Sequence, residues 1–411
     1  MRQFKYGKTK IILLLAVTYV FAKFQGGFAS WFLFYSSLSL FCYESLAYVL
    51  AFRTLEVTRT IERNRLRDGD DLTVTIRLKR KIWFPLGWNV VIDRLPERLA
   101  GVYEEHRHLL FPWFRREIEI RYLIPNVPRG YYQLRECTIL AGDYFGFFQR
   151  RKLVKIDNDF LVYPQFRQIG HWPTEDGKMS GHIHVSHRRS DDVASVRGIR
   201  EYQRGDRLSQ IHWRATARGL GLKTKEFEQQ VMNQLVFFLD VEKRTFPAAT
   251  DPNRLFEVAV KLTAGLVDFA SRQNYHYGLI CQQQEKTIIP PANTQTHYFR
   301  IFDQLARVMP TGEASFARLI SSQSLELAHG VSLVVVTASL QKPLISALLG
   351  LAASGRKIQL FLLHEQPTLG QGEKKMLQLL EASRISCKSL YYRDYEQLRN
   401  VGGAQFGATV S

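Results

Sequence analysis

Hydrophobic and polar positions along the 411-residue chain follow three successive patterns, and the first is a pair of long apolar runs. Residues Ile11–Ala22 and Phe28–Phe52 are apolar almost throughout, and Lys23 and a Gly26-Gly27 pair separate them. Spanning a bilayer takes about 20 residues, so the second run is long enough, and the first spans only if its flanking lysines reach the headgroups. The pattern predicts a membrane hairpin of two transmembrane helices.

The orientation of this hairpin follows from its charged flanks. Basic residues precede Ile11 and follow Phe52, and the positive-inside rule then places both ends in the cytoplasm. A cleaved signal peptide is the alternative, because Gly27-Phe28-Ala29 resembles a small-x-small cleavage site, but a second long run follows at once. We expect a multi-pass protein of the cytoplasmic membrane with both termini cytoplasmic.

The second pattern is an alternation of apolar and polar residues between residues 55 and 165. Alternation with period two is typical of half-buried strands, and Gly-, Pro- and Asp-containing turns separate the candidates. The strand candidates are Leu72–Leu78, Asn89–Ile92, Arg116–Tyr122 and Tyr131–Leu134. Short strands at this spacing predict an antiparallel β-sandwich of immunoglobulin-like kind, with a structural or docking role.

The third pattern, beyond residue 230, alternates buried strands with helices. The strand candidates are Leu235–Leu239, Tyr277–Cys281, Val331–Val336, Ile358–Leu363 and Ser389–Tyr392. The helix candidates are Asn253–Ser271, Phe299–Val308, Ser315–Leu327, Pro343–Ala353 and Glu373–Arg384. This order predicts an α/β domain with a doubly wound parallel sheet, in which ligands bind beyond the carboxyl ends of the strands. Asp240 and Thr337 stand at two of those ends.

These patterns divide the chain into five parts. They are a membrane hairpin (1–54), a β-rich module (55–165), a linker (166–196), a signature motif with an α/β domain (197–400) and a flexible tail (401–411).

Net charge indicates the kind of partner, and cysteine spacing argues against two kinds of cysteine site. The formal net charge of +18 favours an anionic partner, and a tether beside anionic lipid accounts for it, so we expect no nucleic acid. The four cysteines are scattered without metal-binding or paired spacing, which argues against a disulfide framework and a zinc site.

The segment Arg197–Glu228 is dense in Arg, aromatic and Gly residues. Asp206, after Gly205, is a candidate helix N-cap. A helix over residues 207–218 would place Arg207, Arg214 and Arg218 on one stripe with Ile211, and Trp213 on another face. Such a stripe grips a phosphate or carboxylate, or it pairs with the nearby Glu201, Glu226 and Glu228 as a structural brace, the reading that we favour.

The residues after this stripe predict an edge strand. Lys223–Glu228 follows a Gly219-Leu220-Gly221 turn, and we expect it to pair with Leu235–Leu239 in antiparallel fashion.

Catalytic and metal-binding motifs are sparse in the sequence. His182, His184 and His187, with His171 nearby, suggest a metal site, but a polar linker explains them better because no acid or Cys completes the set at the usual spacing. The chain contains no G-x-S-x-G, Walker or H-E-x-x-H motif. We therefore expect no catalytic residue, no cofactor and no enzymatic activity.

The same segment resembles the signature of the bacterial domain-of-unknown-function family number 58. The pattern R-x-Y-x-x-G-D-x-x-R-x-I-x-W-x-x-x-A-R, followed by K-x-F-E, carries the resemblance. The matching residues are Arg200, Tyr202, Gly205, Asp206, Ile211, Trp213, Ala217, Arg218, Lys225, Phe227 and Glu228. Arg207, His212, Arg214 and Glu226 lie among them, and Ser209 stands where the family has a basic residue. The resemblance extends to Arg129–Tyr131, Asp143–Phe147, Val162–Pro164 and the membrane hairpin.

This resemblance implies a membrane-anchored protein with a von Willebrand factor type A-like domain. Members are often encoded beside MoxR-type AAA+ ATPases and transglutaminase-like membrane proteins, so it implies a protein-interaction role with such partners. It also implies a cation site of the form D-x-S-x-S, for which Asp240, Glu242 and Thr311 are candidates. Both Ser positions differ, and Arg244 brings a positive charge there, so we expect no working metal site. A cation-dependent binding module and an enzyme acting on an anionic substrate remain the alternatives.

Overall fold

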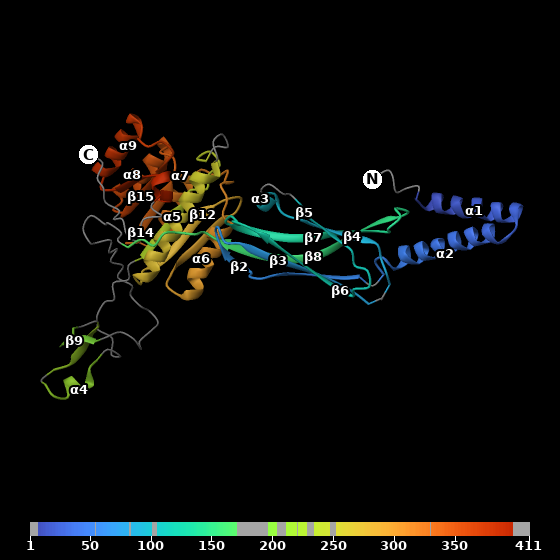
Figure 1. Cartoon of the computed structure of the whole chain (residues 1–411). Coiled ribbons are helices and arrows are strands. Elements are labelled where there is room, and N and C mark those ends of the chain that lie inside the picture. The colour runs from blue at the N-terminus through green and yellow to red at the C-terminus, as the bar shows by residue number, and fades with distance from the viewer. Residues whose placement is uncertain are drawn as a thin grey trace. The chain divides into compact units, whose positions relative to one another are not determined.

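A computed structural model describes most of the chain as two compact units, Met1–Gln165 and Phe166–Ser411 (Figure 1). The described residues are 7–53, 55–81, 84–100, 105–170, 196–203, 211–219, 221–227, 234–246, 252–328 and 330–397. The linker histidines, the flexible tail and the signature residues Gly205, Asp206, Arg207 and Glu228 lie outside them.

The first unit begins with a helical hairpin, α1 (Gly7–Gln25) and α2 (Phe28–Leu50). Ser30, Ser37 and Glu44, spaced seven residues apart, are buried along one side of α2, as is Ala47. Large apolar side chains project outward from both helices. They include Ile12, Leu13, Leu14, Val17, Val20, Phe21 and Phe24 on α1, and Phe28, Phe32, Leu33, Tyr35, Leu46 and Val49 on α2.

One of these helices has the length and composition of a membrane span. α2 has 23 residues and an 18-residue window with mean hydropathy 1.2, of which 17% is buried. α1 is helical as expected, but it has 19 residues and contains Lys8, Lys10 and Lys23. Among the described residues, one helix near the N-terminus, α2, is therefore long and apolar enough to span a membrane, and the second span stays a prediction.

The remainder of the first unit is a sandwich of two sheets. The three-stranded sheet has the order β1 (Leu55–Ile61), β3 (Leu72–Arg80), β6 (Glu117–Ile124). The five-stranded sheet has the order β2 (Arg65–Arg67), β8 (Gln149–Tyr163), β7 (Gly130–Gly142), β4 (Trp88–Arg94), β5 (Glu105–Leu110). The short helix α3 (Glu97–Ala100) connects β4 to β5. All four expected strands are present, and each is longer than its sequence pattern indicated.

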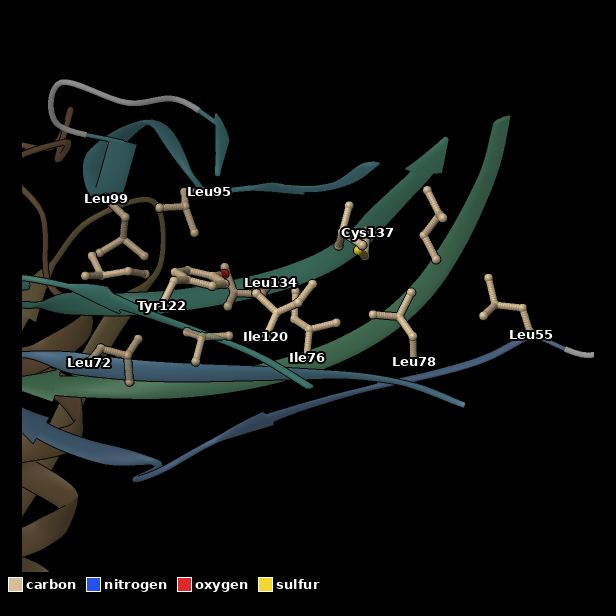
Figure 2. Packing of buried hydrophobic residues seen from close by; sticks show 14 of the residues in the cluster. Leu55, Leu72, Ile76, Leu78, Leu95, Leu99, Ile120, Tyr122, Leu134 and Cys137 are labelled. Atoms are coloured by element: carbon tan, nitrogen blue, oxygen red, sulfur yellow. The ribbon is translucent and has the colours of Figure 1, made fainter. Parts of the chain in front are cut away.

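Alternating residues of the strands form the core between the two sheets (Figure 2). Leu72, Ile76 and Leu78 of β3 are buried at every second position, and so are Ile120 and Tyr122 of β6. Leu134 and Cys137 of β7 face them from the other sheet. The period-two pattern therefore reports burial directly, because successive side chains of a strand point to opposite faces.

A buried ion pair crosses this core. The Arg59 Nη1 atom lies 2.6 Å from Asp93 Oδ1, and both side chains have an exposed fraction of 0%. The Tyr122 hydroxyl donates to Asp93 Oδ2 at 2.6 Å, and Arg59 Nη2 donates to the Leu134 carbonyl. The network joins β1 and β6 of one sheet to β4 and β7 of the other, so it fixes how the sheets face each other.

The second unit is built on a six-stranded sheet. Its order is β13 (Lys286–Ala292), β12 (His276–Gln282), β11 (Gln234–Leu239), β14 (Ser332–Thr337), β15 (Ile358–His364), β16 (Ser386–Tyr391). β13 is antiparallel to β12, and every other neighbouring pair is parallel. β13 escaped prediction because Pro290 and Pro291 interrupt its apolar pattern, which is tolerated at a sheet edge.

Helices cover both faces of this sheet. α7 (Phe316–Glu326), α8 (Lys342–Ala353) and α9 (Gln371–Ala382) pack against one face. α5 (Pro252–Arg272) contacts the sheet with α6 (Gln295–Arg307) and α10 (Tyr392–Gln397) beside it. Because every residue of β14 is buried, the sheet is closed from both sides. The doubly wound α/β arrangement expected from the sequence is present.

Candidate functional site

The candidate site lies at the switch point of the parallel sheet. β11 and β14 are neighbours, and from them the strand order runs outward through β12 on one side and β15 on the other. In open α/β sheets, ligands bind outside the carboxyl ends of the strands at this point. Asp240 directly follows β11, and Thr337 is the last residue of β14.

Asp240 and Thr337 meet there in a buried hydrogen-bond network. Thr337 Oγ1 donates to Asp240 Oδ2 at 2.7 Å, and Thr245 Oγ1 donates to the same oxygen at 2.9 Å. The Glu242 backbone N–H donates to Asp240 Oδ1 at 2.9 Å. Asp240 is 2% exposed, so its carboxylate is held wholly by protein groups.

Burial dominates the acidity of Asp240. Desolvation raises the pKa of this carboxyl from 3.8 to about 6, against the opposing effect of its three hydrogen bonds. The neighbouring charge of Glu242 raises the pKa further. The carboxyl therefore gains a proton far more readily than an exposed Asp does.

Glu242 ties the same loop to α7. Its Oε2 atom accepts from the Phe316 backbone N–H at 3.0 Å, at the first turn of that helix, where negative charge is favourable. Gly312 lies beside this loop, where only a residue without a Cβ fits. A Cβ there would lie 2.6 Å from the Gln282 carbonyl oxygen and 2.9 Å from that of Val241. The loop is thus packed on both sides.

The cavity left at this point is very small. Its lining includes Asp240, Glu242, Thr245 and Ser339, and its volume is ≈ 10 Å³. A single water needs about 10–15 Å³, so the site has no room for a substrate.

The oxygen atoms that line the cavity are the kind of ligand needed by the divalent cation that the family resemblance implies. Carboxylate and hydroxyl oxygens suit a hard cation, which needs about six of them. Here the Asp240 oxygens face hydroxyl and amide hydrogens, and Glu242 Oε2 faces another amide. In the described part of the chain, no three His, Cys, Asp or Glu side chains converge on a point. The residues present do not fit a resident cation.

The candidate ligand Thr311 and the positive charge expected from Arg244 both lie apart from this network. Thr311 is exposed and accepts a weak hydrogen bond from Gln283 Nε2 at 3.4 Å, and it does not line the cavity. Arg244 is also exposed and outside the lining, so its positive charge does not enter the site. Packing against Asp240, rather than the charge of Arg244, is what closes the site.

The described part of the signature segment forms a small hairpin. β9 (Val196–Glu201) pairs with β10 (Lys223–Phe227) in antiparallel register. The expected pairing of Lys223–Glu228 with Leu235–Leu239 is wrong, because β10 takes its partner from within the same motif and β11 pairs with β12 and β14.

The sequence predicted a helix over residues 207–218, long enough to align three arginines on one face. The observed helix is too short for that alignment. Ile211 forms a β-bridge to Thr224, and the helix α4 covers only Trp213–Thr216. His212 caps α4, because its Nδ1 atom accepts from the Ala215 backbone N–H at 3.0 Å.

Several described side chains of the motif lie at its surface. Arg214 and Arg218 are exposed, as is Trp213. Arg200 and Tyr202 belong to the β9 end of the hairpin, and Lys225 and Glu226 to β10. Glu201 forms an ion pair with Lys223 at 3.3 Å.

Thr245 is the site residue that the sequence did not reveal. It lies five positions after Asp240, outside any motif, and only the turn of this loop brings its hydroxyl to the carboxylate. The only signal in the sequence was a Thr five positions after a strand-ending Asp.

Comparison with known proteins gives a family and weak structural likenesses. The model for "Protein of unknown function DUF58" matches residues 198–358. The uncharacterized protein YeaD of Bacillus subtilis (strain 168) is 32% identical over 310 residues, which cover 73% of this chain and 75% of that protein.

Among solved structures, proximal thread matrix protein 1 from the mussel byssus matches with a TM-score of 0.30 and 13% identity, over 40% of this chain and 45% of that one. The CARDB domain of a Pyrococcus furiosus protein, solved with di-metal ions, matches with a TM-score of 0.18 and 13% identity, over 27% of this chain and 96% of that one. Neither likeness is close enough to assign a fold.

Proposed function

Because the chain belongs to the DUF58 family of proteins of unknown function, we propose that it is a membrane-tethered interaction protein. It docks a protein partner and has no catalytic activity of its own. The first expected partner is a MoxR-type AAA+ ATPase. The partner class comes from the family resemblance in the signature segment. A transglutaminase-like membrane protein is the second partner that this resemblance implies.

The helical hairpin supports the tether. α2 is long and apolar enough to span a bilayer, and outward-facing apolar side chains on α1 continue the same kind of surface. Basic residues flank both ends of the hairpin, which favours a multi-pass arrangement with both termini cytoplasmic.

The α/β unit supports a binding role of the von Willebrand factor type A-like kind. Its parallel sheet, antiparallel edge strand and Asp after the first strand agree with that class of domain. The partner would dock on the loops at the carboxyl ends of β11 and β14, where such sheets bind ligands.

One observation carries the proposal: the switch point is filled by its own side chains. Asp240 is satisfied by Thr337, Thr245 and the loop backbone, and the cavity beside it has the volume of a single water. A closed, well-packed edge offers a firm surface for a macromolecule and no pocket for a small substrate.

Affinity purification from native membranes tests this function. The full-length chain is solubilised in mild detergent and captured, and the co-purifying proteins are identified. We expect a MoxR-type ATPase in a fixed ratio to the captured chain. A chain that leaves the membrane on alkaline washing, or that retains its fold and recovers no such ATPase, would count against the proposal.

A further inference from the structure

Exposed aromatic side chains gather at one end of the β-sandwich. They come from the β5–β6 and β7–β8 loops, and we call them the aromatic rim: Phe111 (54% exposed), Trp113 (57%), Phe114 (44%), Tyr144 (42%) and Phe145 (61%). The two loops touch, since the Trp113 and Tyr144 rings are 5.7 Å apart. A clustered apolar surface of this kind marks an interaction site.

The rim is held in an ordered conformation by its own loops. Trp113 has φ 44°, a left-handed backbone that a bulky residue rarely adopts. The Asp143 carboxylate accepts from the backbone N–H groups of Phe145, Phe147 and Phe148. Gly146 supplies the positive φ that this turn requires. The hydrogen bonds of the buried Asp143 and the unusual backbone angles at Trp113 and Gly146 therefore fix the loops in a conformation that exposes the aromatic rings.

The rim lies beside the last two turns of α2. The Tyr43 hydroxyl donates to the Pro85 carbonyl at 3.0 Å, and the adjacent Leu86 carbonyl accepts from Tyr144 at 3.1 Å. In the same β7–β8 loop, the Phe148 ring lies 5.6 Å from the Tyr48 ring of α2. The β7–β8 loop is therefore anchored next to the end of the candidate span, and a β-bridge between Leu86 and Trp113 holds the β5–β6 loop beside it.

The length of α2 fixes how deep these contacts lie. From Phe28 to Tyr43 the helix rises about 22 Å, at about 1.5 Å per residue. The hydrocarbon core of a bilayer is about 30 Å thick. A span that begins at Phe28 is therefore still within the membrane boundary where Tyr43 meets the β-sandwich, and tilting the helix only increases this depth.

We propose that the aromatic rim inserts into the headgroup region of the membrane that α2 crosses and binds anionic phospholipid there. Aromatic side chains favour the membrane–water interface. Exposed Arg115 and Arg116 directly follow Phe114 of the rim and match the phosphates of such a lipid surface. The rim would fix the β-sandwich against the bilayer, so that the module does not swing freely on its tether. This inference rests on the membrane tether of the proposed function.

Nitroxide labels on the full-length chain in phosphatidylglycerol–phosphatidylethanolamine vesicles measure this depth. Single cysteines are placed at Phe145 and Phe111 of the rim, in a chain whose two non-buried cysteines, Cys42 and Cys387, are changed to Ser. Leu33→Cys, on the outward face of α2, reports the tether. Leu123→Cys is the matched control, because it is 51% exposed at the far end of β6.

Collision rates with lipid-soluble oxygen and with a water-soluble nickel chelate are compared at each label. We expect the oxygen-to-nickel ratio at Phe145→Cys and Phe111→Cys to exceed that at Leu123→Cys several-fold. An oxygen-to-nickel ratio at the rim equal to that at Leu123→Cys, together with a lipid-like ratio at Leu33→Cys, overturns the inference and leaves the tether intact. The rim would then be a surface for a protein partner. A water-like ratio at Leu33→Cys overturns the tether and the inference together.

Discussion

The carboxyl of Asp240 gives the α/β unit a pH dependence whose sign and size follow from its burial. Its pKa is raised from 3.8 to about 6 in the folded protein, so between these values the folded chain holds a proton that the unfolded chain has released. Stability contributed by this group is therefore greatest below about pH 4 and is lost as pH rises through about 6. A shift of about two pKa units corresponds to about 3 kcal/mol.

Substituting Asp240→Asn removes this titration while keeping an acceptor oxygen for the Thr337 hydroxyl. We expect the difference in unfolding free energy between the wild-type chain and this variant to change by about 3 kcal/mol between about pH 4 and pH 7, in favour of the wild type at low pH. Urea titration of the full-length chain in detergent, followed by circular dichroism, measures this difference. Glu313→Gln, at an exposed acid of the same unit, is the control.

A difference that stays constant with pH, or that grows in the opposite direction, would refute the reasoning. It would mean that Asp240 is ionised at no cost in the folded protein, and the closed site described above would then have to admit water or a cation.

Three further predictions concern the two cores and the candidate site. Arg59→Met leaves Asp93 buried without its cation, and we expect the β-sandwich to lose about 3–5 kcal/mol of stability in a denaturation curve, with partial recovery in an Arg59→Met, Asp93→Asn double variant. Gly312→Ala places a Cβ 2.6 Å from the Gln282 carbonyl oxygen, and we expect a loss of about 1–3 kcal/mol in urea, whereas Gly350→Ala, with open space around it, costs nothing. Mg²⁺ or Mn²⁺ should leave the thermal transition of the full-length chain unchanged, because Asp240 is already satisfied, and a rise with cation concentration would contradict this.

Strands with a clean alternation could be predicted from the sequence, and those without it could not. β3 alternates Leu72, Val74, Ile76 and Leu78 with polar residues, so the sequence alone predicts which of its faces points inward. β8 was missed because Asp157, Asn158 and Asp159 resemble a turn in its middle. Its pairing with β7 along nearly its whole length outweighs that local preference.

Polar residues that face inward were the other obstacle. Arg59 and Asp93 each occupy a polar position in a strand, and the sequence pattern treats such positions as exposed. Only the pairing of the two sheets brings them together, across 34 residues of sequence. A buried polar pair is invisible to periodicity for this reason.

Only part of the candidate site could be predicted from the sequence. Asp240 and Thr337 could be placed together because parallel strands end at the same edge of a sheet. The role of Thr245 depends on the turn after Asp240, and the exposure of Arg244 depends on the same turn. Loop geometry of this kind is set by packing against α7 through Glu242, which no local pattern encodes.

The central claim, a partner docked on the carboxyl ends of β11 and β14, is tested most directly by a paired charge reversal. Arg244 is exposed in the loop after β11, and Arg384 is exposed in the turn before β16, at the opposite ends of the strands. The affinity of a purified MoxR-type ATPase is measured for the full-length wild-type chain, Arg244→Glu and Arg384→Glu. We predict that Arg244→Glu weakens binding by about tenfold, or about 1.4 kcal/mol, and that Arg384→Glu leaves it unchanged. Equal affinities for all three proteins, or a greater loss with Arg384→Glu, would contradict the account.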